Sequence, residues 1–367
     1  MRSARALTFF VVLAALVAVG WLVGRHFRDA RDGSKPEAER RSAQTDGGAG
    51  GIVPADTASD MLGRIFDRLR SGSLQPGELA FLRRRLLEAE PRQAIGAILS
   101  FLASGKDART GEKLEVGKGG ELVGAPTFRV MLLDLLGRIS RDSGAPDAAL
   151  FSRTLLDRKT SADEWAIALR NIAWSTPSER SFLAGKVREM LTYQPWRQQP
   201  TAGFLEAFDL VVFTRDVTLV PDLGEMVTGE DDSLRRAAAA AMDRLSEMAP
   251  LDVMNYLNGH PAEFADRPFL RADYYSKADL SSAPQRQAVE TYLSRQDVTA
   301  AEKAKLLSMF ASPGTFVDDT LVTERPAADD APQRAAGLQT AIGDWLKSNR
   351  FPDLNGPLVL LERNIAN

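Results

Sequence analysis

The chain has 367 residues, of which 44% are apolar and 26% charged, which is typical of a folded chain with room for two ordinary domains or one extended repeat domain and a tail. Its formal net charge of -3 and its 7% aromatic content give no support to a nucleic-acid partner. The absence of cysteine excludes disulfides, thiol nucleophiles and thiolate metal sites, and only two histidines, His26 and His260, are left for a histidine relay.

The first apolar segment is 7–24, LTFFVVLAALVAVGWLVG, which carries no charge and follows a short basic N-terminus at 1–6. As a helix it would span roughly 27 Å at about 1.5 Å per residue, close to the ~30 Å hydrocarbon core of a bilayer. Trp21 near its end is typical of an interfacial anchor. We therefore predict a transmembrane helix at 7–24. A signal peptide cleaved after 18–20 is the alternative, although the apolar run continues past that site.

Two patterns in the residues that flank this helix predict opposite orientations in the membrane. More arginine and lysine residues follow the helix than precede it, so the positive-inside rule would keep the rest of the chain in the cytoplasm. A short basic N-terminus before an apolar run also resembles a bacterial signal anchor, which exports the residues downstream. We predict a single-pass protein of the bacterial inner membrane with its soluble part on the periplasmic side, and the cytoplasmic orientation stays open.

Residues 25–56 alternate positive and negative charges and then become GGAGG. Such a composition buries too little apolar surface to fold. We predict a flexible charged and glycine-rich linker between the membrane helix and the rest of the chain.

Helical periodicity begins after this linker. Apolar side chains recur at helical spacing in 61–69, 79–86 and 95–102, with arginine residues on the opposite faces of the first two segments. Pro91 stands where a first-turn proline opens a helix. Three helices separated by very short breaks predict an antiparallel helical stack.

The interval 106–126 is rich in glycine and has no helical stripe, so we predict a long loop or a small β-hairpin there. The run 111–119 superficially resembles a phosphate-binding loop. Five residues separate Gly111 from Gly117 where that motif has four, and Gly119 stands where it needs Ser or Thr. The sequence therefore favours a glycine-rich hairpin over a nucleotide site.

Helices resume after this interval, and their starts are marked by capping residues. Thr127 and Ser161 stand at the positions of N-caps, and Pro146 opens a further helix. Thr176 is followed three residues later by Glu179, the spacing of a capping box, which predicts another helix start.

The clearest repeat pattern lies at 204–248. We expect one apolar helix over 204–213 and a second that begins around Pro221; the acidic turn 231–232 then precedes Arg235 and an alanine run at 237–241. This order resembles a HEAT repeat, whose period of about 40–47 residues implies about five helix pairs in a HEAT-like α-solenoid domain over 57–260. An irregular helical domain without true repetition is the alternative.

We predict a C-terminal helical region over 261–367. Its beginning, 268–283, reads as an irregular connection, and helices return at 283–295, 299–310 and 333–348, with a short capping helix at the end. The polar stretch 312–332 is too long for an ordinary connector, so we predict a mobile or functional loop.

Candidate chemical groups are few, and each has an ordinary structural explanation. His260 stands at a helix end, where histidine favourably meets the helix dipole. The acidic pair 231–232 fits a helix start, whereas 318–319 and 329–330 fit solvated acids better than calcium ligands, because no spaced calcium loop accompanies them. The basic run 83–85 with Arg92 indicates either a salt-bridged helix face or a site for an anionic partner.

The sequence predicts an all-α protein with no catalytic, cofactor-binding or metal-binding residue, and it favours a binding protein over an enzyme. We expect a membrane-tethered scaffold or adaptor whose extended helical surface holds a protein partner, without nucleic acid or a small-molecule cofactor. The first alternative is a cell-wall glycan-acting enzyme or accessory factor with a helical superhelix, and the second is an envelope assembly chaperone.

Overall fold

The computed structural model describes residues 57–310, 319–323 and 331–366. They belong to a compact unit that extends from Asp56 to Asn367. The predictions made for 1–6, 7–24 and 25–56 lie outside the described residues. Within the described ranges, no helix has both the length and the apolar content needed to cross a membrane.

The described unit consists of α-helices joined by short turns, with one small hairpin, which confirms the all-α prediction. Its α-helices are α2 (Ala58–Ser71), α3 (Glu78–Glu88), α4 (Pro91–Ala103), α5 (Phe128–Ser143), α6 (Asp147–Leu155), α7 (Ala162–Ser175), α8 (Arg180–Leu191), α9 (Gln194–Gln198), α10 (Ala202–Glu206), α11 (Asp209–Thr214), α12 (Val220–Thr228), α13 (Asp232–Met248), α14 (Pro250–Gly259), α15 (Pro268–Ser276), α16 (Ala283–Ser294), α17 (Ala300–Met309), α18 (Ala331–Lys347) and α19 (Asn355–Ala366). Short 3₁₀ turns occur at η1 (Lys118–Gly120), η2 (Val217–Leu219) and η4 (Pro352–Leu354).

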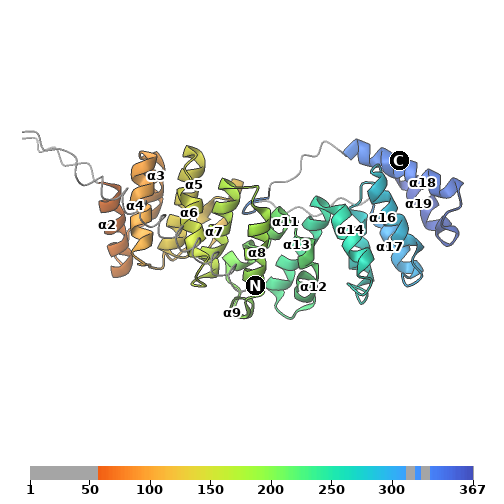
Figure 1. Ribbon diagram of the computed structural model, residues 1–367, viewed down its shortest axis with the longest axis horizontal. Coiled ribbons are helices and arrows are strands. Elements are labelled where there is room, and N and C mark those ends of the chain that lie inside the picture. Colours follow the sequence, from red (N-terminus) through yellow and green to blue (C-terminus); the bar gives the residue numbers. More distant parts are fainter. Residues whose placement is uncertain (1–56, 311–318, 324–330, 367) are drawn as a thin grey trace, which may run out of the picture. The chain divides into compact units, whose positions relative to one another are not determined.

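The helices stack in pairs that follow one another in chain order (Figure 1). The closest packing is between helices near in sequence, such as α6 with α7, α12 with α13 and α4 with α5. Each pair buries its apolar faces against the next, so one continuous apolar core runs through the unit from α2 to α19.

Local sequence explains how the first helix forms. The Thr57 side chain accepts a hydrogen bond from the backbone N–H of Asp60, and the helix ends at Gly72, whose φ of 68° suits glycine. Leu62 and Phe66 are buried on the face predicted from their spacing. The predicted caps Thr127 and Ser161 are likewise confirmed at the starts of α5 and α7.

The glycine-rich interval forms the predicted hairpin. Strand β1 (Glu115–Val116) pairs antiparallel with β2 (Leu122–Gly124), with Val116 opposite Leu122. The turn η1 between them needs φ values of 69° at Gly119 and 78° at Gly120, which explains the glycine pair. The hairpin, not a phosphate loop, is therefore the structure of this segment.

The prediction of one helix over 204–213 is wrong, because the segment forms α10 and α11 with a break at Ala207 and Phe208. Around the break the backbone N–H groups of Phe208, Leu210 and Val211 each bond three residues back instead of four. This tighter turn separates two helices that are both apolar, so the apolar spacing alone did not reveal the break.

The prediction of an irregular connection over 268–283 is also wrong in its first half, where α15 forms. Pro268 occupies the first turn of this helix, where its missing N–H costs nothing. The buried face of α15 carries Arg271, Tyr274 and Tyr275, so it shows no aliphatic stripe that would have predicted a helix.

The predicted capping box at Thr176 is wrong as well. Thr176 ends α7, and its hydroxyl donates to the carbonyl of Ile172. Helix α8 begins only after Glu179, whose carboxylate pairs with Arg153 instead of returning to a cap. A tertiary ion pair has replaced the local motif.

The close approach of α5 and α7 gives a test of this packing. A Cβ on Gly137 in α5 would overlap the side chain of Asn171 in α7, whereas one on Gly63 in α2 would meet open space. We expect Gly137→Ala to lower the free energy of unfolding by about 1–3 kcal/mol through overpacking. Gly63→Ala, the control, should raise it by about 0.5–1 kcal/mol, because alanine favours a helix. Denaturant unfolding measures both, and a stabilising Gly137→Ala would contradict the packing.

Candidate functional site

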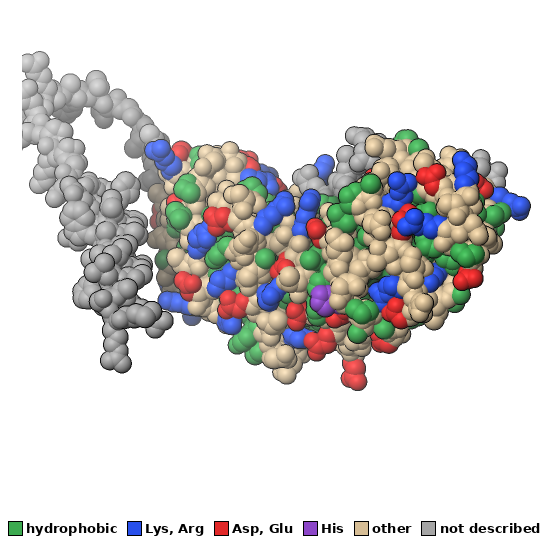
Figure 2. Space-filling model, turned by 45° about the vertical axis from the view of Figure 1, so that its right-hand side comes forward, with side chains coloured by type: hydrophobic (Ala, Val, Ile, Leu, Met, Phe, Trp, Pro, Cys, Tyr) green, Lys and Arg blue, Asp and Glu red, His purple; other side chains and the backbone are tan. Residues whose placement is uncertain are grey.

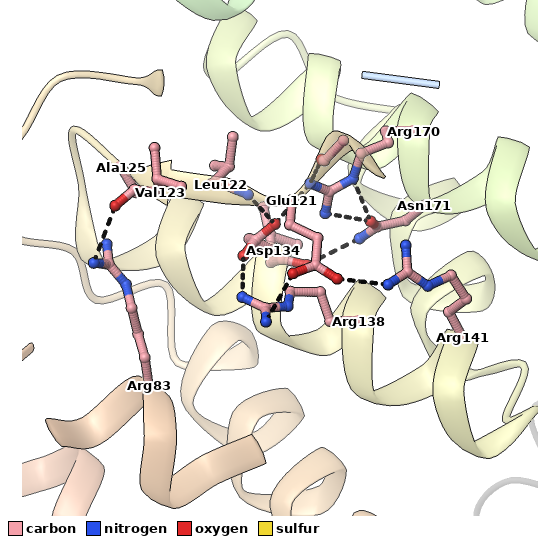
Figure 3. A network of polar contacts seen from close by, with 12 residues as sticks. Arg83, Glu121, Leu122, Val123, Ala125, Asp134, Arg138, Arg141, Arg170 and Asn171 are labelled. Carbon is pink, nitrogen blue, oxygen red and sulfur yellow. Dashed lines mark hydrogen bonds and ion pairs between the residues drawn. The ribbon is translucent and has the colours of Figure 1, made fainter. Parts of the chain in front are cut away.

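The centre of the site is Arg170 on α7, whose side chain has no exposed surface. Its guanidinium donates to the Asp134 carboxylate on α5 at 2.6 Å, to the Gly120 carbonyl of the hairpin at 2.8 Å and to the Asn171 side chain at 2.9 Å (Figure 3). The guanidinium also lies over the ring of Trp174, with the Arg170 Cζ atom 4.0 Å from the ring centroid. One buried cation therefore joins two helices and the hairpin.

Burial alone would make this arrangement costly. Removal from water lowers the pKa of Arg170, and the charge and hydrogen bond of Asp134 oppose that shift. A guanidinium remains protonated in proteins, so its charge has to be balanced where it lies. Asp134 provides that balance and also accepts from the backbone N–H of Leu122 in β2 at 3.0 Å.

The outer end of the hairpin is fixed by a second ion-pair group. Glu121 forms ion pairs with Arg138 at 2.8 Å and with Arg141 at 2.6 Å, both on α5 (Figure 3). Arg83 of α3 reaches β2 through the carbonyl of Val123 at 3.5 Å and pairs with Glu112. The hairpin is thus held from two helices by charged side chains.

The hairpin turn contacts a segment from the far end of the sequence. Leu321 is completely buried, and its carbonyl lies so near Gly120 that a Cβ there would overlap it. Residues 320–323, which we call the docked segment, appear in Figure 1 as a short blue stretch between two grey traces, close to α11 and away from α17 and α18. The segment belongs to the loop predicted over 312–332; residues 311–318 and 324–330 lie outside the described part.

Asp209 and Arg244 hold the docked segment by its backbone. The Asp209 carboxylate on α11 accepts from the N–H of Val322 at 2.7 Å and of Thr323 at 2.9 Å. Arg244 on α13 donates to Asp209 at 2.6 Å and to the Thr323 carbonyl at 3.3 Å. The Thr323 hydroxyl donates to the Asp209 carbonyl at 3.3 Å. Three of these contacts, from Asp209 to the two N–H groups and from Arg244 to the carbonyl, recognise main-chain groups of the docked segment.

A separate buried ion pair joins α15 and α17. Arg271 and Glu302 form two hydrogen bonds of 2.7 and 3.0 Å, and both side chains are almost wholly buried. The Tyr292 hydroxyl also donates to Glu302, and burial together with this carboxylate raises the pKa of the Tyr292 phenol. Both carboxylate oxygens accept from these donors, so the group stabilises the packing of the two helices.

His260 is exposed at the end of α14, as its sequence position predicted. Its ring stacks on Tyr256 with centroids 4.1 Å apart, and Nδ1 lies 2.8 Å from the Tyr256 carbonyl. In the described ranges no group of three or more histidine, aspartate or glutamate side chains could hold a metal ion.

The acidic pair 231–232 begins α13, as predicted. Asp231 accepts from the N–H of Leu234 at 2.7 Å, and Asp232 pairs with Arg235. Of the other two pairs only Asp319 is described; it has a φ of 55°. The remaining three acids lie outside the described residues.

The basic run of α3 is in part neutralised. Arg83 pairs with Glu112, Arg85 lies 3.7 Å from Glu88, and Arg84 lies over the ring of Phe81. On the face of the unit seen in Figure 2, positive, negative and apolar side chains alternate without a large patch of one charge. The salt-bridged helix face is therefore the better interpretation of this run.

The sequence did not identify the residues that hold the docked segment. Asp209 and Arg244 each stand among ordinary helical residues, and nothing local distinguishes them from surface charges. Arg170 did leave a signal, because it interrupts the apolar run 165–173 on a helix that is buried on every side. Comparison with known proteins does not extend the assignment, since no family model, curated protein or solved structure matches the chain significantly.

The Arg170 centre can be tested by neutralising its partner. We expect Asp134→Asn to lower the free energy of unfolding by about 3–5 kcal/mol, because it leaves a buried guanidinium without a balancing charge. Glu88→Gln, which breaks the exposed pair with Arg85, should change it by less than about 1 kcal/mol. Denaturant unfolding compares the two, and equal losses would show that Arg170 is not held by charge.

Glu206, one turn before Asp209, gives a pH-dependent test. Burial, and then the charge of Asp209, raise the pKa of its carboxyl above the ordinary 4.5. The folded state therefore takes up the Glu206 proton more readily than the unfolded state, and ionisation at higher pH costs stability. We expect Glu206→Gln to raise Tm at pH 7, and this gain should disappear as the pH falls below about 4.5.

Glu189→Gln is the matched control of opposite sign. Burial acts to raise the pKa of Glu189, but hydrogen bonds from Lys186 and Lys159 outweigh it and lower that pKa. This substitution should lower Tm at pH 7, by a small amount because the group is partly exposed. The difference should vanish in acid. Thermal unfolding from pH 3 to 8 measures both variants, and a shared sign would contradict the assignment.

Proposed function

We propose that this protein is a membrane-tethered, protein-binding scaffold or adaptor built on a HEAT-like α-solenoid. The observation that carries the proposal is the docked segment, a short bent piece of chain that the stacked helices hold through main-chain hydrogen bonds. Many partner proteins are recognised through short segments of chain, and stacked helix pairs expose long surfaces for such segments.

The HEAT-like character has its best support in the pair α12 and α13. An acidic turn joins them, and Arg235 donates to the Gly229 carbonyl at 3.4 Å and pairs with Asp232 of the same turn. The buried alanines 238 and 241 let α13 approach its neighbours closely. The stacking of successive pairs supports extending this repeat along 57–260.

The tether and its orientation rest on the apolar segment 7–24 and its flanking charges. We expect the full chain to sediment with membranes, and a chain that lacks 1–28 to move to the soluble fraction. Protease added to intact inner-membrane spheroplasts should digest 57–367, as expected for a periplasmic position. Membrane retention of the shortened chain would overturn the tether, and protection from protease would place the unit in the cytoplasm.

Site-specific crosslinking tests protein binding itself. A photoactivatable side chain at Val123, which is 57% exposed on the hairpin, should give a discrete adduct with another protein in cells. The same probe at Leu360, 60% exposed on α19, is the matched control and should give none. Equal labelling from both positions, or from neither, would remove the support for a partner near the hairpin.

The two alternatives remain distinct from this proposal. A cell-wall glycan-acting enzyme needs a carboxyl group with a raised pKa beside the scissile bond. A clearing zone on a cell-wall zymogram would replace the scaffold with that enzyme. An envelope assembly chaperone differs from a scaffold in the lifetime of its complexes, so adducts confined to newly made partner chains would favour it.

A further inference from the structure

We propose that the surface occupied by residues 320–323 is a peptide-recognition site, which binds a short bent segment of a partner protein with an apolar residue followed two positions later by threonine or serine. The docked segment is its intramolecular occupant. This inference rests on the proposed function as a protein-binding scaffold and names the chemistry of its ligand.

The site recognises backbone first. Asp209 accepts from two successive N–H groups, of Val322 and Thr323, and Arg244 donates to the carbonyl of Thr323. The carboxylate and the guanidinium are themselves paired at 2.6 Å, with side chains only 4% and 12% exposed. These acceptors and donors suit any chain that bends in this way, because they contact main-chain groups, of which proline lacks only the N–H.

Two side chains supply selectivity. Leu321 is fully buried, so the position takes an apolar side chain and rejects a charged one. The Thr323 hydroxyl donates to the Asp209 carbonyl at 3.3 Å, and Thr323 is 8% exposed, so serine or threonine fits there. Val322 between them is only partly buried, so its identity matters less.

The hairpin completes the site on its other side. Gly120 touches the Leu321 backbone where any Cβ would collide with it, and Arg170 fixes Gly120 through its carbonyl. The site is therefore assembled in advance by buried ion pairs, a requirement for binding a peptide without a large ordering cost. A ligand from another protein would have to displace the docked segment, whose attachment to the same chain gives it a high effective concentration.

The test uses the full chain in detergent and a fluorescent peptide with the sequence of residues 318–325, DDTLVTER. Leu321→Ser in the protein weakens the binding of the docked segment to its site. The variant should therefore bind the peptide at least about tenfold more tightly than the unchanged chain. If the first variant folds poorly, Val322→Pro is the second variant. It removes one N–H donor to Asp209 and so also weakens the binding of the docked segment. Fluorescence anisotropy measures binding, and circular dichroism confirms folding.

Glycine substitutions in the Leu321→Ser chain locate the peptide. Gly120→Ala should reduce its affinity at least about tenfold, because the new Cβ would occupy the space of the Leu321 backbone. Gly119→Ala is the matched control: its φ of 69° is strained like the 78° of Gly120, but its Cβ would meet open space. A peptide that carries serine in place of Leu321 should also lose affinity.

Three results would overturn the inference: no binding to a folded Leu321→Ser or Val322→Pro chain, equal binding to the unchanged chain, or equal effects of the two glycine substitutions. Exchange of the docked segment between two copies, seen as a dimer by light scattering that Leu321→Ser abolishes, would also overturn it by assigning the site to self-association. If the peptide does not bind but the Val123 crosslink persists, the scaffold proposal stands and this inference fails. If the peptide binds but Val123 gives no adduct in cells, the proposal of a cellular protein partner loses its support.

Discussion

The charge of Arg170 has to be balanced inside the protein, and much of the surrounding architecture follows from that constraint. Asp134 supplies the opposing charge at 2.6 Å, and the Gly120 carbonyl supplies a further acceptor. A cation without such partners would be far too costly at a site with no exposed surface. The hairpin is consequently fixed against α5 and α7, and its turn meets the docked segment at Gly120.

The docked segment joins parts of the chain that are far apart in the sequence, whereas most helix contacts in this unit are between helices near in the sequence. Stacked helix pairs are stabilised by contacts between adjacent elements, as between α6 and α7 or α12 and α13. Asp209 and Val322 are separated by 113 positions in the sequence, yet they are joined by a hydrogen bond of 2.7 Å. The proposed binding function rests on this segment, because its contacts define the chemistry of the surface that holds it.

The chemistry of that surface is consistent with a protein ligand. A buried carboxylate that accepts from two backbone N–H groups forms strong, charge-assisted hydrogen bonds without reading side chains. One apolar contact at Leu321 and one hydroxyl at Thr323 then add selectivity. The Arg271 and Glu302 pair shows the contrasting case, in which Tyr292 and Arg271 donate to both carboxylate oxygens and form a structural link between helices.

The sequence by itself determined the features that depend on local energetics. Caps at Thr127 and Ser161, the apolar face of α2 and a glycine-rich hairpin within 106–126 were all predicted, since each needs only nearby residues. Tertiary structure alone decided the break between α10 and α11, the buried polar face of α15 and the attachment of residues 320–323. These depend on partners distant in the sequence: a charge such as Asp209 appears solvated in the sequence until folding buries it beside Arg244.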